Sequence, residues 1–171
     1  MEYAKDNGDW ILVPSSTKEL EAVRKKCKRL VIRRAAISAG VAAVPIPGID
    51  IATDIGMLAI LIEKINLEFG LTPAQIERLQ PKMKLVAYEM IVGMGSVLVG
   101  KVITRDLVAR LLKRAGAKVM VRHSAKIVPV VGQMASAAVG FTAFRTIGYQ
   151  HIEACVEVAA ELVSLRMKAA S

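Results

Sequence analysis

The sequence predicts an all-α protein, a compact helical bundle of about six helices. Apolar residues recur at helical spacing along most of the chain, and no stretch shows the alternation typical of a strand. Residues of the AVILMFWYC set make up 54%, which excludes a disordered chain, and two cysteines are too few for a disulfide scaffold. A length of 171 residues suits one domain. We expect this domain over residues 16–171, after an N-terminal extension over residues 1–15.

The first helix is expected over residues 17–43. Ser16 and Glu19 fit a capping box, in which Ser16 is the N-cap and Glu19 stands at N3. The first half of this helix is amphipathic. Its apolar side carries Leu20, Val23, Cys27, Leu30 and Val31, and its basic side carries Arg24, Lys25, Lys28, Arg29 and Arg33. The second half has no charge and is rich in small residues, which permits close helix approach.

Prolines and glycines separate the later helices. A second helix is expected from near Asp50 to Phe69, with Gly70 as its stop. Thr72, followed by Pro73 and by glutamine at N3, predicts the start of a short helix that ends by residue 81. Three further helices are expected over about residues 82–100, 104–126 and 132–166.

A weak internal repeat has an offset of 84 residues. The segment Val44–Gly48 matches Val128–Gly132, which predicts two similar hairpins, each a helix, a Pro/Gly turn and a helix. The residues assigned to these turns are Pro45, Pro47, Gly48, Asp50, Pro129 and Gly132. Asp50 and Asp54 are four residues apart, and we prefer a stabilising first-turn role for them over a functional carboxylate pair.

Basic residues are the main candidate for a functional surface. The net charge is +9, and residues 101–126 alone carry 8 basic residues and 1 acidic residue. The predicted contact residues for an anionic membrane surface or an acidic partner are Arg24, Lys25, Lys28, Arg29, Arg33, Arg110, Lys113, Arg114, Lys118, Arg122 and Lys126. The alternative is a solvated helix face. Nucleic acid is disfavoured because aromatics make up only 4% and no DNA-binding motif is present.

An acidic row on the last helix has two interpretations. Glu153, Glu157 and Glu161 recur every fourth residue. They would form either a solvated face or a surface that docks against a basic row at residues 110–126. This row recurs every fourth residue and consists of Arg110, Arg114, Lys118, Arg122 and Lys126, with Lys113 beside it.

No motif predicts catalysis, a cofactor or a metal site. Residues 95–101 match GxxxxGK, but position 102 is valine and the preceding segment reads as helix, so a phosphate loop is not expected. His123 and His151 are isolated, which disfavours zinc. Cys27 and Cys155 have no CxxC partner and are expected to be reduced thiols of a cytosolic protein. We therefore expect a non-enzymatic protein.

Two charge-free stretches raise the question of membrane spans. Residues 35–49 contain two prolines, and residues 127–144 contain Pro129 and Gly132 near their start. Without these turns each stretch is shorter than the roughly 20 residues that a spanning helix needs. Shallow re-entrant hairpins or buried core helices are therefore expected rather than simple spans.

Two segments resemble a known family. The stretch AAVPIPGIDIATDIGMLAILIEKINLEFGLTPAQIERL (Ala42–Leu79) and the stretch KIVPVVGQMASAAVGFTAF (Lys126–Phe144) are similar to a bacterial hydrophobic helical domain, the domain of unknown function 697. They also resemble the C-terminal helical domain of immunity-related GTPases. The resemblance covers roughly residues 30–165 and implies an all-α module that associates with membranes or regulates a GTPase. The chain has no G domain, so GTP hydrolysis is not implied for it.

Three functions are consistent with these observations. The first is a non-enzymatic membrane-associating helical module at the cytoplasmic face of a membrane, which regulates or anchors a GTPase-type or other partner. The second is a soluble adaptor or oligomerisation domain that binds a protein, or a second copy of itself, through an apolar helical surface. The third is a pore-forming toxin domain, based on the glycine-rich helix expected over Ile91–Gly100 and on the paired hairpins.

Overall fold

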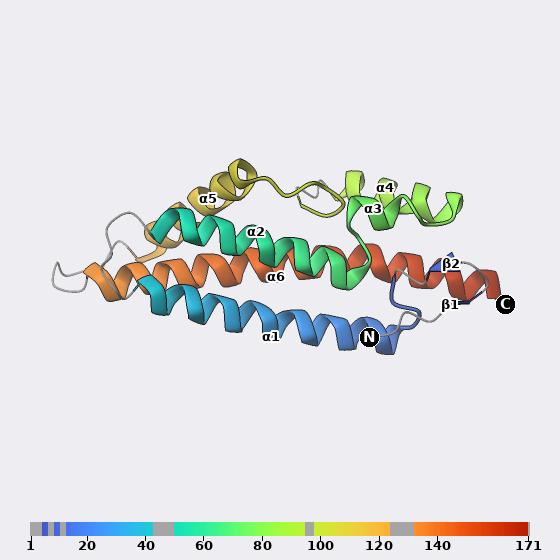
Figure 1. The fold of residues 1–171 in the computed structure, drawn as a ribbon, viewed down its shortest axis with the longest axis horizontal. Coiled ribbons are helices and arrows are strands. Elements are labelled where there is room, and N and C mark those ends of the chain that lie inside the picture. The colour runs from blue at the N-terminus through green and yellow to red at the C-terminus, as the bar shows by residue number, and fades with distance from the viewer. Residues whose placement is uncertain are drawn as a thin grey trace. The chain divides into compact units, whose positions relative to one another are not determined.

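The computed structural model confirms an all-α bundle. It describes residues 5–6, 9–10, 13–42, 50–94, 98–123 and 132–170, with side chains over 13–37, 55–94, 98–114 and 141–169. The elements are β1 (Lys5–Asp6), β2 (Asp9–Trp10), α1 (Thr17–Ala42), α2 (Asp50–Phe69), α3 (Pro73–Ile76), α4 (Pro81–Gly93), α5 (Arg105–His123) and α6 (Gly132–Ala170) (Figure 1). Asp50 is thus the first residue of α2, and Gly132 is the first residue of α6, whereas the predicted turn prolines lie outside the described residues.

The predicted helix starts of α1 and α3 are confirmed by their caps. Ser16 Oγ accepts a hydrogen bond from the Glu19 amide at 3.2 Å. The Glu19 carboxylate departs from the standard box, because it accepts from the amide and hydroxyl of Ser15, both at 2.8 Å. Thr72 and Gln75 form the complete reciprocal box in front of Pro73. These contacts satisfy amides that the first helical turn leaves without a partner.

One prediction about local structure is wrong, and one short element was not predicted. The helix expected over residues 82–100 ends at Gly93, and Gly100 adopts a left-handed backbone with φ of 66°. Glycine weakens a helix interior and readily takes this conformation, so the glycine-rich segment ends the helix. The N-terminal extension contains an antiparallel pair, in which Lys5 is opposite Trp10 and Asp6 is opposite Asp9. The Asn-Gly dipeptide between these strands in the sequence is a signal for a hairpin of this kind.

The chain forms two compact units. Unit 1 comprises Met1–Cys27, Glu63–Val102 and His151–Ser171, and unit 2 comprises Lys28–Ile62 and Ile103–Gln150. Helices α1, α2 and α6 each contribute one part to each unit. In unit 1, the C-terminal part of α6 runs beside the start of α1 (Figure 1). Fully buried side chains from several helices fill its core: Cys27, Ile65, Phe69, Ile76, Ala87, Ile152, Cys155 and Leu162.

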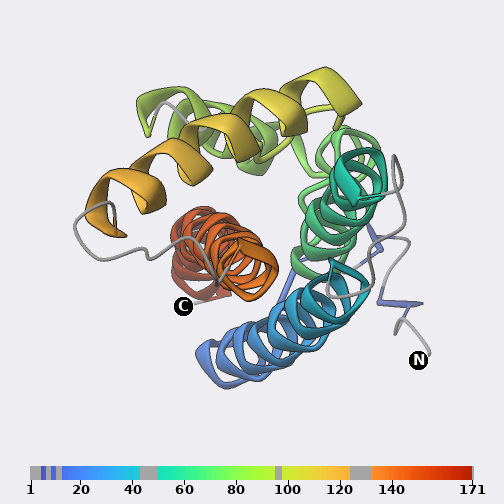
Figure 2. The same cartoon turned by 90° about the vertical axis from the view of Figure 1, so that its left-hand side faces the viewer.

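In unit 2, parts of α1, α2 and α5 are arranged around α6 (Figure 2). Its core includes Ala35, Leu58, Val108 and Phe144, all of which are buried. α1 and α6 approach closely where Gly148 faces Val31. A Cβ added at Gly148 would lie 2.8 Å from both γ-methyl groups of Val31. Among the described residues, no helix is long and apolar enough to cross a membrane.

Candidate functional site

The basic side of α1 is divided between exposed and half-buried residues. Lys25, Arg29 and Arg33 are exposed, as the amphipathic pattern predicts. Arg24 and Lys28 are half-buried and contact other parts of the protein. The predicted contact surface on α1 is therefore smaller than the sequence indicates.

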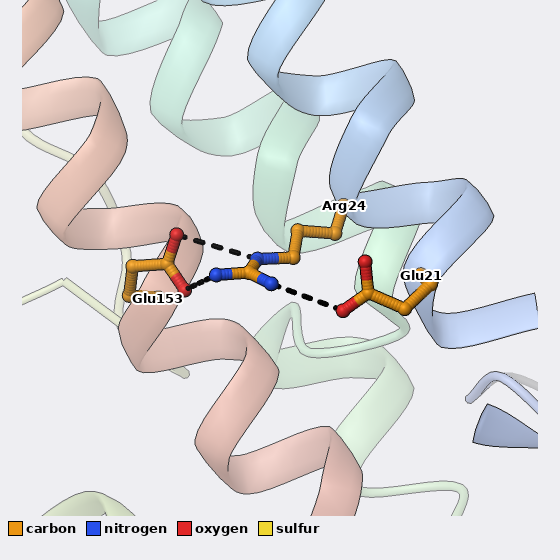
Figure 3. Close-up of polar contacts among 3 residues, drawn as sticks. All are labelled: Glu21, Arg24 and Glu153. Atoms are coloured by element: carbon orange, nitrogen blue, oxygen red, sulfur yellow. Dashed lines mark hydrogen bonds and ion pairs between the residues drawn. The ribbon is translucent and has the colours of Figure 1, made fainter. Parts of the chain in front are cut away.

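Arg24 is held by two carboxylates of its own chain (Figure 3). Its Nη2 lies 2.6 Å from Glu153 Oε2, its Nε donates to Glu153 Oε1 at 3.3 Å, and its Nη1 lies 3.0 Å from Glu21 Oε1. The hydrogen bond to Glu153 and then that to Glu21 raise the pKa of the Arg24 guanidinium. This two-point contact joins α1 to α6 inside unit 1. The first member of the acidic row on α6 thus binds α1, whereas we expected the row to be solvated or docked on residues 110–126.

Lys28 lies over an aromatic ring that the sequence analysis did not single out. Its Nζ is 5.6 Å from the centre of the Tyr149 ring, and the guanidinium carbon of Arg145 is 5.5 Å from the same centre. A ring face attracts cations at this distance. Tyr149 and Arg145 are four residues apart on α6, a spacing that places them on one helix face.

The exposed cations of α5 form the second part of the candidate surface. Arg110, Lys113 and Arg114 are exposed, while Val108 on the same helix is buried. Arg110 Nε donates to the backbone carbonyl of Asp106 at 3.2 Å. Lys118 and Arg122 belong to α5, but their side chains are not among those described, and Lys126 lies outside the described residues.

The predicted basic row cannot form one straight line along α5. An α-helix turns about 100° per residue, so each step of four residues rotates the row by about 40°. From position 110 to position 126 this amounts to about 160° if the helix were to continue. The part of this basic surface that the structure describes with side chains therefore consists of Arg110, Lys113 and Arg114, which are all exposed near the start of α5.

The charge of the chain is distributed very unequally between the two units. The segments of unit 1 carry 12 basic and 12 acidic residues, whereas those of unit 2 carry 12 basic and 3 acidic residues. The whole net charge of +9 therefore belongs to unit 2. Charge counts along consecutive stretches of the sequence do not predict this separation, because each unit is assembled from segments that are distant in the sequence.

A buried polar cluster in unit 1 corrects the prediction that His151 is isolated. The Cys155 thiol donates to Asn66 Oδ1 at 3.6 Å, and His151 Nε2 lies 3.6 Å from the same sulfur. Asn66 Nδ2 also donates to the Leu98 carbonyl at 3.2 Å. The four-residue spacing of His151 and Cys155 on α6 is the signal that would have predicted their contact.

This cluster has the residue types of a cysteine nucleophile with its base, but its environment does not suit that chemistry. All three side chains are buried, and burial raises the pKa of the Cys155 thiol well above its usual value. A reactive cysteine needs a lowered pKa and access to substrate. Among the described residues, no group of histidine, cysteine and acidic side chains is arranged to hold a metal ion. The cluster therefore fits a structural role, in which it satisfies polar atoms in the core.

The described end of the GxxxxGK segment also has a structural role. Leu98 and Val99 are buried, and the Leu98 carbonyl is occupied by Asn66. A Cβ at Gly100 would lie 2.8 Å from Ile91 Cδ1 and 3.0 Å from Ile76 Cδ1. The left-handed backbone and the close packing are therefore sufficient reasons for glycine at position 100.

Comparisons with known proteins returned no relative: no family model, curated protein or solved structure matches the chain. The resemblance to the helical domain of immunity-related GTPases therefore rests on the quoted segments alone. The functional candidates have to be weighed on the charge, exposure and contacts of this chain's own residues.

Proposed function

We propose that the chain is a non-enzymatic helical module that associates with an anionic membrane surface through the cations of unit 2. The observation that carries this proposal is the charge separation, with 12 basic and 3 acidic residues in unit 2 against 12 and 12 in unit 1. Lysine and arginine near an anionic leaflet contribute about 1 kcal/mol each. The cytoplasmic leaflet is the anionic one, so the module would work there.

The local environment of these cations supports the proposal. The sequence has no acidic residue over positions 22–49 and none over positions 107–152, so α1 has no acidic residue after Glu21 and α5 has none after Asp106. Within each helix these like charges therefore reinforce one another's field. The burial and raised pKa of the Cys155 thiol argue against a cysteine nucleophile in the buried polar cluster. If the resemblance holds, a GTPase-type partner would supply any nucleotide chemistry.

Vesicle flotation with matched charge reversals tests the proposal. Wild-type protein should float with vesicles that contain phosphatidylserine and stay behind with phosphatidylcholine alone. The test variant R110E/K113E/R114E reverses three exposed cations of unit 2, and the control R78E/K82E/K101E reverses three exposed cations of unit 1. Both variants change the net charge equally. Lower recovery of the test variant alone is the expected result, and equal recovery of all three proteins on both vesicle types would contradict the proposal.

A second candidate function is protein binding through α4. Ala87 and Ile91 are buried on one side of this helix, yet Leu85 and Val92 are 59% and 77% exposed on the other, with exposed Tyr88 beside them. These residues have the i, i+3, i+7 spacing of helix anchors that dock in an apolar groove. Light scattering of purified protein tests self-association directly. If α4 mediates it, L85S/V92S reduces the measured mass without changing vesicle recovery.

The pore-forming alternative loses its main basis. It rested on a glycine-rich helix over Ile91–Gly100, but α4 ends at Gly93 and the described residues 98–100 lie outside any helix. We therefore do not carry this alternative further.

A further inference from the structure

The outward face of α1 changes its chemistry along the helix. In the unit 2 part of α1, whose side chains are described over residues 28–37, the exposed residues of that range are arginine, isoleucine and alanine: Arg29, Ile32, Arg33, Ala36 and Ile37. In the unit 1 part the exposed residues include Lys18 and Glu19, so both signs of charge are present. A solvated helix face is ordinarily of the second kind. The Arg/Ile face, defined as the five exposed residues above, needs a different explanation.

Close packing on the opposite side fixes which residues face outward. Val31 and Ala35 are fully buried, and Gly148 of α6 approaches Val31 so closely that no side chain would fit there. This contact fixes the rotation of α1 about its own axis. Ile32 and Ile37, whose side chains are 38% and 46% exposed, therefore face away from the contact. On a helical wheel they flank the two arginines, one on each side.

We infer that the Arg/Ile face contacts the lipid surface itself, with an apolar as well as an electrostatic component. This inference rests on the proposed membrane association and specifies how it occurs. Guanidinium groups bind phosphate in a bidentate manner, and their aliphatic stems can lie along apolar surface. The flanking isoleucines would enter the boundary between head groups and acyl chains, as apolar side chains of interfacial helices do.

Charge and polarity together favour lipid over other anionic partners. A nucleic acid would use the arginines, but base stacking needs aromatic side chains, and this face has none. A wholly acidic protein surface would also use the arginines and leave the isoleucines in water. A lipid surface offers phosphate and an apolar layer at adjacent depths, which matches both residue types.

A salt series separates the two components. Salt at about 1 M screens exposed charges almost completely, whereas about 0.1 M does not. Wild-type protein should keep a measurable fraction of its binding to phosphatidylserine vesicles at high salt. The variant I32S/I37S should bind at least about tenfold more weakly there, because apolar area is no longer buried. The control I60S changes a 54% exposed isoleucine of α2 in the same unit and should bind as wild type does.

An indole probe measures insertion directly. In a W10F background, the substitution Ile37→Trp should give fluorescence that brominated acyl chains quench, and Ile60→Trp should not. Circular dichroism of each variant verifies folding, which should persist in the isoleucine variants because Ile32, Ile37 and Ile60 are exposed.

The outcomes distinguish the two proposals. If wild-type protein does not float with anionic vesicles, the membrane proposal fails. If it floats, but I32S/I37S matches wild type at both salt concentrations and the indole at position 37 is not quenched, only the Arg/Ile face is refuted. Binding to duplex DNA that equals vesicle binding and is unchanged by I32S/I37S would also overturn the inference.

Discussion

The contact between Gly148 and Val31 gives a sharp prediction about stability. In Gly148→Ala the new methyl group would lie 2.8 Å from both γ-carbons of Val31, well inside van der Waals contact. A valine in a helix has essentially one side-chain rotamer, so Val31 cannot turn away. Relief therefore requires a shift of α1 against α6 within unit 2, and we expect the substitution to destabilise the protein.

The magnitude follows from two opposing terms. Overpacking a core contact costs about 1–3 kcal/mol, and replacing glycine by alanine in a helix recovers about 1 kcal/mol. The net loss is therefore about 0–2 kcal/mol. Gly56 of α2 is the matched control, because a Cβ there meets nothing within 4 Å. Gly56→Ala should stabilise the protein by about 1 kcal/mol, which separates the two variants by about 1–3 kcal/mol.

Thermal unfolding followed by circular dichroism measures this difference. For a chain of this length 1 kcal/mol corresponds to about 2–4 °C in Tm, so Gly148→Ala should melt clearly below Gly56→Ala. Adding Val31→Ala to Gly148→Ala should recover part of the loss, with a coupling free energy of about 0.5–3 kcal/mol. Equal stabilisation by both glycine substitutions would refute the close contact of α1 and α6.

Three further predictions concern unit 1. Burial raises the pKa of the Cys27 thiol to about 12 and that of the Cys155 thiol well above its usual value. Both thiols should therefore resist alkylation at neutral pH until the protein unfolds. Rapid labelling of the native protein, detected by mass spectrometry, would contradict this. Hydrogen bonds, chiefly from Tyr88, lower the pKa of the Glu77 carboxyl group. The contribution of Glu77 to stability is therefore present above the usual carboxyl pKa and is lost as the pH falls through the lowered value. Tyr88→Phe should raise the NMR titration midpoint of Glu77, and an unchanged midpoint would exclude the hydrogen bond. Asn66→Leu leaves a buried carbonyl without its donor and should cost about 1–3 kcal/mol in urea unfolding, whereas an unchanged midpoint would show that the polar cluster adds no stability.

Local signals were sufficient to predict most helices. Ser16 and Thr72 mark the starts of α1 and α3 through their own hydroxyl groups, and Gly70 follows the end of α2 with φ of 72°. Each of these signals involves residues only three or four positions apart, so it can be recognised from the sequence alone. The same holds for Val31 and Cys27, whose helical spacing correctly predicts a buried stripe.

The contacts that define the candidate site depend on distant segments. Arg24 and Glu153 are 129 positions apart, so their ion pair could not be anticipated from spacing. The same applies to Asn66 and Cys155, and to the charge separation between units. The end of α4 at Gly93 was missed for another reason, since the apolar run over residues 91–99 hides the effect of its glycines.

Flotation of the full chain with vesicles of increasing phosphatidylserine content tests the central claim most directly. If the cations of unit 2 bind an anionic surface, recovery should rise with the anionic fraction, and R110E/K113E/R114E should reduce the rise while R78E/K82E/K101E preserves it. Recovery that is independent of lipid charge, or is lowered equally by both variants, would contradict the account.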